Sequence, residues 1–180
     1  DPNIINKIIN LEKIKNINII EIGPGKGALT DKILTELPKS LILIEKDKNL
    51  ANYLIEKYKK YKIVKIYNND VLKINLSKLI RSKTVVFGNL PYNISSQILI
   101  KLIRLEKWPP KFSDLIFMFQ KEVAEKIIGK SYGRLSIITN FKLVFKKGFY
   151  VSPNCFFPKP KVKSMVIQMK PRTTSKYKIK

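Results

Sequence analysis

Short apolar runs rich in β-branched residues alternate along this chain with segments of helical periodicity. Parallel strands need long crossover connections, usually helices, and the helical segments are long enough to provide them. The alternation therefore predicts an α/β fold with a central, mostly parallel sheet and helices on both faces. The strand-like runs cover residues 18–22, 41–44, 63–67, 85–88 and 115–119, and the helical patterns cover 28–37, 50–58 and 96–105.

The pattern changes in the last third of the chain. A short helix is expected over residues 135–141, and two further strands over 143–145 and 164–169, which makes a seven-stranded sheet. A proline-rich loop, residues 152–160, lies between these two strands. We assign residues 1–170 to one domain and residues 171–180 to a polar, basic tail.

Composition excludes several kinds of chemistry. The 180 residues include no histidine and a single cysteine, Cys155, which rules out disulfides within the chain and Ser-His or Cys-His machinery. We therefore expect no metal site. No apolar run approaches the roughly 18 residues of a membrane span. Any chemistry must rely on carboxylates, amides, aromatic rings, lysines or a cofactor.

Charge is the strongest compositional signal. The chain has 36 Lys and Arg residues against 13 Asp and Glu residues, a net charge of +23. A field of this size attracts polyanions, so it favours a nucleic-acid partner. Two alternatives are a codon bias that inflates Lys, Asn and Ile, and an anionic membrane surface. The bias does not account for so few acidic residues, and no strongly amphipathic basic helix supports membrane binding.

A glycine-rich turn joins the first expected strand to the first expected helix. It reads Glu21-Ile22-Gly23-Pro24-Gly25-Lys26-Gly27. Glycines at these positions allow a tight turn and a close approach of ligand to backbone. The spacing differs from that of dinucleotide oxidoreductases and of phosphate-binding P-loops. Taken alone, the turn is as consistent with a structural role as with a ligand site.

Acidic residues follow the next two strands. Glu45, with Lys46 beside it, ends the second strand 20 positions after Gly25, where a carboxylate can accept hydrogen bonds from a ribose diol. Asp70, followed by Val71, comes after the third strand and can accept from an adenine amine. Taken alone, Asp70 is more often a helix cap. Ligands of open α/β sheets bind at this carboxyl edge, which favours the ligand role for Glu45.

The segment Asn89-Leu90-Pro91-Tyr92 follows the fourth strand and is the most specific motif. An adenine N6 amine is a poor nucleophile, and a site can help by accepting both of its hydrogens. Asn89 can offer its side-chain oxygen, and Leu90 or Pro91 a backbone oxygen. Tyr92 can stack on an extruded base. We expect its ring, rather than its hydroxyl, to matter, so that phenylalanine could replace it.

Together these motifs resemble the ribosomal RNA adenine N6-dimethyltransferase family. That family includes the KsgA-type enzymes of the small subunit and the Erm enzymes of macrolide resistance. The similarity extends to residues 156–164, Phe156 to Ser164, which is similar to a late family motif. In the family the first aromatic residue of that motif, matched by Phe156, lies on the face of the target base opposite Tyr92.

The resemblance implies a Rossmann-like class I methyltransferase that uses S-adenosyl-L-methionine. Its substrate would be adenosine in small-subunit ribosomal RNA. It would act as a monomer in the cytoplasm, or in an organelle if a transit peptide has been removed. The implied catalytic and base-binding residues are Asn89, Leu90, Pro91, Tyr92 and Phe156. The implied cofactor-binding residues are Glu21, Gly23, Gly25, Gly27, Glu45, Lys46, Asp70, Val71 and Asn89.

Two parts of the family pattern fall outside this sequence. Family members normally begin with a basic arm and a Gly-Gln-x-Phe-like segment, and they continue into a small helical domain. The sequence starts at Asp1-Pro2, and residues 171–180 are too short for that domain. We expect residues 1–170 to form the catalytic domain without its arm, and residues 171–180 to begin the helical domain.

Other functions remain open at this level. Within the family, residues 152–158 and 129–134 favour the small-subunit branch over an Erm-like enzyme acting on large-subunit RNA. A non-catalytic nucleic-acid-binding relative, such as a mitochondrial transcription factor B, would keep the fold. An enzyme that methylates DNA or a protein amide could use a similar Asn-Pro-containing loop. The intact Asn89 motif, the late motif and the charge favour RNA methylation.

Overall fold

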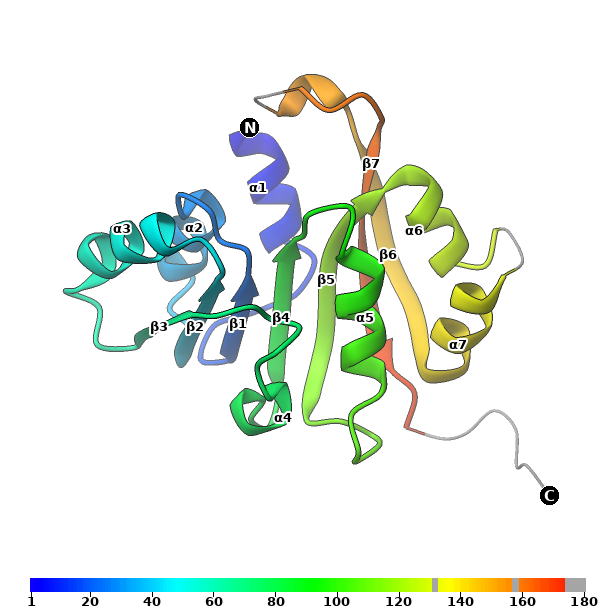
Figure 1. Ribbon diagram of the computed structural model, residues 1–180, viewed down its shortest axis with the longest axis horizontal. Coiled ribbons are helices and arrows are strands. Elements are labelled where there is room, and N and C mark those ends of the chain that lie inside the picture. Colours follow the sequence, from blue (N-terminus) through cyan, green and yellow to red (C-terminus); the bar gives the residue numbers. More distant parts are fainter. Residues whose placement is uncertain (131–132, 157–158, 174–180) are drawn as a thin grey trace.

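The computed structural model describes residues 1–130, 133–156 and 159–173. Within these residues a seven-stranded sheet, in the order β3-β2-β1-β4-β5-β7-β6, forms the centre of the molecule (Figure 1). The elements in chain order are α1 (Pro2–Ile9), β1 (Asn18–Ile22), α2 (Ala28–Thr35), β2 (Ser40–Glu45), α3 (Lys48–Tyr58), β3 (Val64–Asn68), α4 (Leu76–Leu79), β4 (Thr84–Asn89), α5 (Ser95–Ile103), β5 (Phe112–Gln120), α6 (Lys121–Ile127), α7 (Arg134–Lys142), β6 (Leu143–Val151), the 3-10 turn η1 (Pro153–Cys155) and β7 (Ser164–Pro171).

The first five strands are parallel, and β7 runs antiparallel to both β5 and β6. Strand β1 pairs with β2 on one side and with β4 on the other. The strand order therefore reverses between β1 and β4, and the carboxyl ends of both strands open onto the same edge. Ligands of doubly wound sheets bind at such a point. The predicted mostly parallel, seven-stranded α/β sheet is confirmed.

Two apolar clusters cover the two faces of the sheet. Along β1, Ile19 belongs to a cluster with side chains of α1, α2 and α3. Its neighbour Ile20 belongs to a cluster with side chains of α5 and α6. Phe87 and Val86 of β4 divide in the same way. Side chains alternate between faces along a strand, so apolar runs with no polar interruption fit a sheet buried on both sides.

The sequence prediction missed three helices and shortened one strand. Helix α1 is only 8 residues long, and its signal was local: Asp1 accepts from the backbone N–H of Asn3 at 2.8 Å, and Pro2 occupies the first helical position. Helices α4 and α6 also lacked a long periodic pattern. Strand β6 reaches Val151, whereas the prediction stopped at residue 145. The prediction stopped early because the middle of the strand is solvent-exposed and carries no apolar pattern, and the register shifts there, between Phe145 and Lys147.

Two further predictions can be placed only in part. The predicted boundary at residues 170 and 171 falls within β7, and residues 174–180 lie outside the described residues. The stretches 129–134 and 152–158 also include residues outside that range. Among the helices that the structure describes, none is long and apolar enough to cross a bilayer.

Candidate active site

The predicted base-binding residues line one pocket at the carboxyl edge of the sheet. This pocket, of about 290 Å³, is bordered by Asn89, Leu90, Pro91, Tyr92, Phe156 and Pro160. Asn89 is the last residue of β4, the next three follow it, and the other two come from the connection between β6 and β7. The structure thus brings together two segments that are more than 60 residues apart in the chain.

Within this pocket, Leu90 is fixed by packing and Tyr92 by hydrogen bonds. The Leu90 side chain is buried over Gly88, where an added Cβ would lie only 2.7 Å from it. The Tyr92 hydroxyl lies 2.6 Å from the hydroxyl of Ser164 at the start of β7. The Ser95 hydroxyl donates to the backbone carbonyl of Tyr92 at 3.1 Å, where α5 begins. Asn89, by contrast, is exposed to solvent.

A second pocket adjoins the first. Its volume is about 170 Å³. It is bordered by Asp1, which caps α1, by three isoleucines of α1, by the glycine turn region, and by four residues from later in the chain: Ile4, Ile5 and Ile8; Glu21, Gly23, Pro24, Ala28 and Leu29; and Asn89, Met118, Cys155 and Phe156. Asn89 and Phe156 border both pockets. They therefore stand where a ligand in one pocket would meet a ligand in the other.

The wall that α1 contributes was missed from the sequence. In Figure 1 the start of α1 lies beneath the loop between β6 and β7, which agrees with the contact of Asp1 and Phe156 with the same pocket. The Asp1-Pro2 pair is a helix-start signal that could have predicted this helix. It could not have predicted the helix's position, because that depends on tertiary packing of the isoleucines.

The glycine turn adopts conformations that suit glycine. Gly23, Gly25 and Gly27 have φ values of +68°, +57° and +83°. A Cβ on Gly27 would collide with the Tyr58 hydroxyl, whereas a Cβ on Gly25 would meet no atom within 4 Å. Gly27 is therefore packed against α3, and Gly25 leaves open space above the backbone. These two glycines have different roles, which their spacing alone did not reveal.

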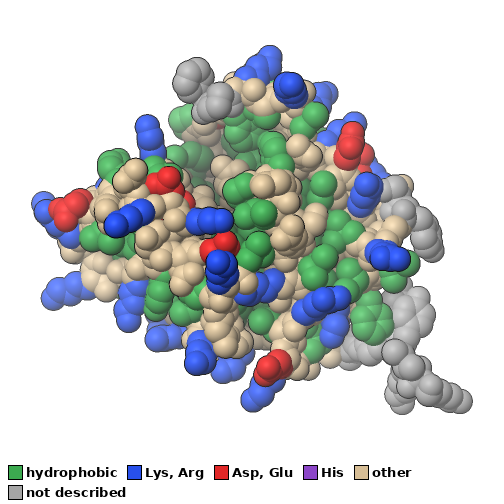
Figure 2. Space-filling view, in the orientation of Figure 1, with side chains coloured by type: hydrophobic (Ala, Val, Ile, Leu, Met, Phe, Trp, Pro, Cys, Tyr) green, Lys and Arg blue, Asp and Glu red, His purple; other side chains and the backbone are tan. Residues whose placement is uncertain are grey.

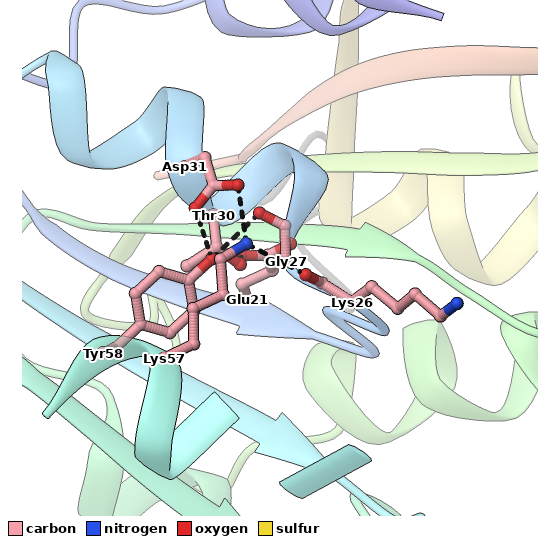
Figure 3. A network of polar contacts seen from close by, with 7 residues as sticks. All are labelled: Glu21, Lys26, Gly27, Thr30, Asp31, Lys57 and Tyr58. Carbon is pink, nitrogen blue, oxygen red and sulfur yellow. Dashed lines mark hydrogen bonds and ion pairs between the residues drawn. The ribbon is translucent and has the colours of Figure 1, made fainter. Parts of the chain in front are cut away.

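A polar network fastens this turn to the neighbouring helices (Figure 3). The Tyr58 hydroxyl donates to the Gly27 carbonyl at 3.0 Å and to Asp31 at 2.7 Å. The Lys57 ammonium donates to the Lys26 carbonyl at 3.1 Å and to Asp31 at 2.7 Å. Both side chains come from α3, while Asp31 lies on α2. The turn is thus held by side chains of α3 and α2.

Glu21 lies beneath the turn and is fully buried. Its carboxylate accepts a hydrogen bond of 2.6 Å from Thr30. Burial raises the pKa of Glu21 from 4.5 to about 7, although the Thr30 bond opposes the shift. Glu21 therefore has a structural partner as well as a place at the second pocket. Its predicted contact with a cofactor stays a prediction.

The carboxylates that follow β2 and β3 lie beside the turn. Glu45 accepts from the backbone N–H groups of Gly25 at 3.2 Å and of Asp47 at 2.9 Å. Asp70 accepts from the backbone N–H of Leu72 at 2.9 Å and pairs with Lys46 at 3.1 Å. These contacts, the backbone bond first, lower the pKa of Asp70. Asp70 thus caps a turn, and its predicted contact with a cofactor stays a prediction.

Val71 differs from the other predicted cofactor residues because it is buried in one of the apolar clusters. The Glu45 carboxylate contacts the backbone of Gly25, and Lys46 pairs with Asp70. None of these three residues borders either of the two pockets. Of the predicted cofactor residues, Glu21, Gly23 and Asn89 border the second pocket, whereas Gly25, Gly27, Glu45, Lys46, Asp70 and Val71 do not.

The sequence and the fold both match known proteins. A family model described as ribosomal RNA adenine dimethylase matches residues 1–180. The chain is 43% identical over 176 residues to ribosomal RNA small subunit methyltransferase A of Pelagibacter ubique, covering 96% of this chain and 66% of that protein. It is 43% identical over 183 residues to the protein of the same name from Blochmanniella floridana, covering 97% of this chain and 66% of that protein. The chain thus spans about two thirds of the length of these relatives.

Solved structures support the same family and the same fold. A dimethyladenosine transferase from Plasmodium falciparum is 34% identical, with a TM-score of 0.83 over 96% of this chain and 62% of that one. The 23S rRNA methyltransferase ErmE is 24% identical, with a TM-score of 0.83 over 99% of this chain and 71% of that one, and it shows the shared fold alone. The sheet is therefore that of the class I methyltransferases, and the chain belongs to the ribosomal RNA adenine dimethylase family.

Proposed function

We propose that this chain is the catalytic domain of an enzyme that methylates the N6 amine of adenosines in small-subunit ribosomal RNA, with S-adenosyl-L-methionine as methyl donor. The observation that carries the proposal is the pair of adjoining pockets. One is bordered by the glycine turn, the other by two aromatic residues, and Asn89 and Phe156 border both. Family membership and the names of the relatives support the choice of RNA.

The residues at the glycine turn fit the proposed cofactor. Gly25 leaves its backbone open, and the Glu45 carboxylate is oriented toward it by two backbone N–H groups. Each carboxylate oxygen keeps a lone pair for a further donor, so Glu45 can hold a ribose diol. Asp70 can accept from the adenine amine in competition with Lys46. When bound, the cofactor supplies an electrophilic methyl group.

The residues after β4 suit the proposed acceptor. Asn89 can accept one N6 hydrogen through its side-chain oxygen. The backbone carbonyl of Pro91 already accepts from Ile94 at 3.1 Å, so we favour the carbonyl of Leu90 for the other hydrogen. Accepting both hydrogens favours a tetrahedral, nucleophilic nitrogen. No strong base is needed, because the nitrogen readily loses a proton once it is methylated.

Two rings can hold the base. Tyr92 and Phe156 both border the first pocket and can stack on a flat, unpaired base without reading its neighbours. Lys159, Lys161 and Lys163 follow Phe156 in the chain and are exposed. They are placed to bind phosphates beside the base. Figure 2 shows that Lys and Arg side chains far outnumber acidic ones on the face drawn there.

The proposal needs only one copy of the chain, since a single chain contributes every residue named above. We extend it to a monomer that acts in the cytoplasm. We also propose that residues 1–170 belong to the catalytic domain, and that residues beyond them help to engage the ribosomal subunit.

The test is methylation of unmethylated small ribosomal subunits with isotope-labelled S-adenosyl-L-methionine, followed by primer extension. Label in N6-methylated adenosine of the small-subunit RNA is expected. Large-subunit RNA is assayed in parallel, and label there instead would favour the Erm-like alternative. A protein that binds the cofactor by calorimetry but labels neither RNA would contradict the proposal.

Glu45→Ala provides a matched test of the cofactor site. It should weaken cofactor binding by about 1–3 kcal/mol, the range for a hydrogen bond to a charged acceptor. Glu56→Ala is the control, because Glu56 is an exposed α3 carboxylate paired with Lys59. Equal affinities for the two variants would remove Glu45 from the site.

A further inference from the structure

Ser164 ends the late motif and has no part in the function proposed above. It is fully buried at the first position of β7, where the loop that carries Phe156 rejoins the sheet. Its backbone lies between two strands, opposite Gln120 of β5 and Val151 of β6. The position of its hydroxyl is therefore fixed by the sheet rather than by a loop.

The partner of this hydroxyl is Tyr92. The two oxygens are 2.6 Å apart, although the residues are 72 positions apart in the chain. This distance is at the short end of the range for hydroxyl pairs. Tyr92 itself lies in the connection between β4 and α5, where the ring could otherwise adopt several rotamers. The bond thus links the segment that carries Tyr92 to β7, the strand that follows Phe156 in the chain.

We infer that Ser164 is a positioning residue, which holds the Tyr92 ring at the spacing from Phe156 that an adenine base requires. The inference rests on the proposed function. A ring that is held before the base enters loses no rotamer freedom on binding, so the base is placed more firmly. The Tyr92 hydroxyl then matters, and phenylalanine cannot fully replace tyrosine there, contrary to the sequence-based expectation.

A double-mutant cycle tests the inference. Ser164→Ala and Tyr92→Phe remove the same hydrogen bond from opposite ends, and each keeps the stacking ring. Each should slow single-turnover methylation of unmethylated small subunits by about 5- to 10-fold, as expected for one hydrogen bond. The double variant should be no slower than either single variant, because the bond can be lost only once.

Three measurements separate positioning from a general loss of structure. Cofactor affinity should be unchanged in all variants, because the bond lies on the base side. Ser164→Thr keeps a hydroxyl and should restore most of the rate. Thr84→Val is the matched control: Thr84 is a buried hydroxyl in the sheet that donates to the Arg81 carbonyl at 2.7 Å, and it lies at the opposite end of β4. It should lower the melting temperature without slowing methylation.

Base stacking provides a readout that does not depend on turnover. A short RNA with 2-aminopurine at the target position should be less quenched by Ser164→Ala and Tyr92→Phe than by the unaltered protein. Full rates and full quenching in both variants, or additive losses in the double variant, would overturn the inference. If Ser164→Ala does not fold, Tyr92→Phe alone decides it. An unaltered protein that methylates neither RNA overturns the proposed function instead.

Discussion

The proposed cofactor side and the proposed base side of this site are built differently. On the cofactor side, a strand, a turn and a helix that are consecutive in the chain form the cradle, and α3 fastens it through Tyr58 and Lys57. On the base side, the loop after β4 faces the connection between β6 and β7, and the Tyr92–Ser164 hydrogen bond joins them. A cradle made of neighbouring residues can form from local sequence. A pocket made of distant segments depends on the whole sheet.

The comparison predicts that changes on the base side affect rate, whereas changes on the cofactor side affect stability or cofactor affinity.

The largest effect is expected from Asn89→Ala, which removes one acceptor for the N6 hydrogens. The methylation rate should fall about 10²- to 10³-fold, by analogy with the loss of one oxyanion-hole donor. Single-turnover kinetics beside a cofactor titration will measure it. Asn93→Ala, an exposed residue of the same loop, is the control; a near-normal rate for Asn89→Ala would leave the motif as a structural turn.

The second prediction concerns Glu21 and stability. Its carboxyl group has a pKa of about 7 in the folded protein and 4.5 when solvated, so the folded state binds the extra proton between these values. The contribution of Glu21 to the free energy of unfolding should therefore be largest below pH 4.5, fall as the pH rises to 7, and then level off. The total change should be about 3 kcal/mol. Urea unfolding from pH 5 to 8 will measure it. Glu21→Gln should flatten this slope, and an unchanged slope would show that another group is responsible.

The third prediction returns to the base side. Phe156→Ala removes one stacking wall and should weaken base placement by about 1–3 kcal/mol. Since Phe156 also borders the second pocket, a smaller loss of cofactor affinity would accompany it. Phe156→Leu keeps the volume without the flat ring and serves as the control. Calorimetry and 2-aminopurine quenching separate the two effects, and a variant with normal quenching would show that Phe156 is only a core residue.

The smallest effect is expected from Tyr58→Phe. This change removes the hydroxyl that holds Gly27, but Lys57 still bridges Lys26 and Asp31. A loss of about 1 kcal/mol of stability is expected, with an unchanged methylation rate. Tyr58→Phe and Tyr92→Phe each remove one tyrosine hydroxyl, so the two variants can be compared in the same assays. A slower methylation rate for Tyr58→Phe than for Tyr92→Phe would contradict the expectation that base-side changes affect the rate more than cofactor-side changes do.

The sequence was most informative where structure is local. The glycine turn, Glu45 and the segment from Asn89 to Tyr92 each directly follow a strand-like run, so the shared carboxyl edge of a parallel sheet was enough to group them. The five parallel strands were predicted within a few residues because each contains a run of mostly apolar, β-branched or aromatic residues. Strand β6 was cut short because its exposed middle residues carry no such pattern.

Features that depend on packing between distant segments were not predictable in this way. The sequence offered no reason to place α1 against the second pocket, to assign Gly27 to α3 rather than to a ligand, or to pair Tyr92 with Ser164. Each of these contacts joins residues that only the completed sheet brings together. The resemblance to a family supplied the role of Phe156, which the residues alone left as equally consistent with a core side chain.

The position of β7 also sets an order of events during synthesis. This strand is inserted between β5 and β6, so β6 gains its neighbour in the sheet only when the chain has reached residues 164–171. A nascent chain emerges from its amino end. The cradle around the glycine turn can therefore close while later residues are still being added, but the wall that carries Phe156 cannot. Because Phe156 borders both pockets, neither pocket is complete until β7 has joined the sheet.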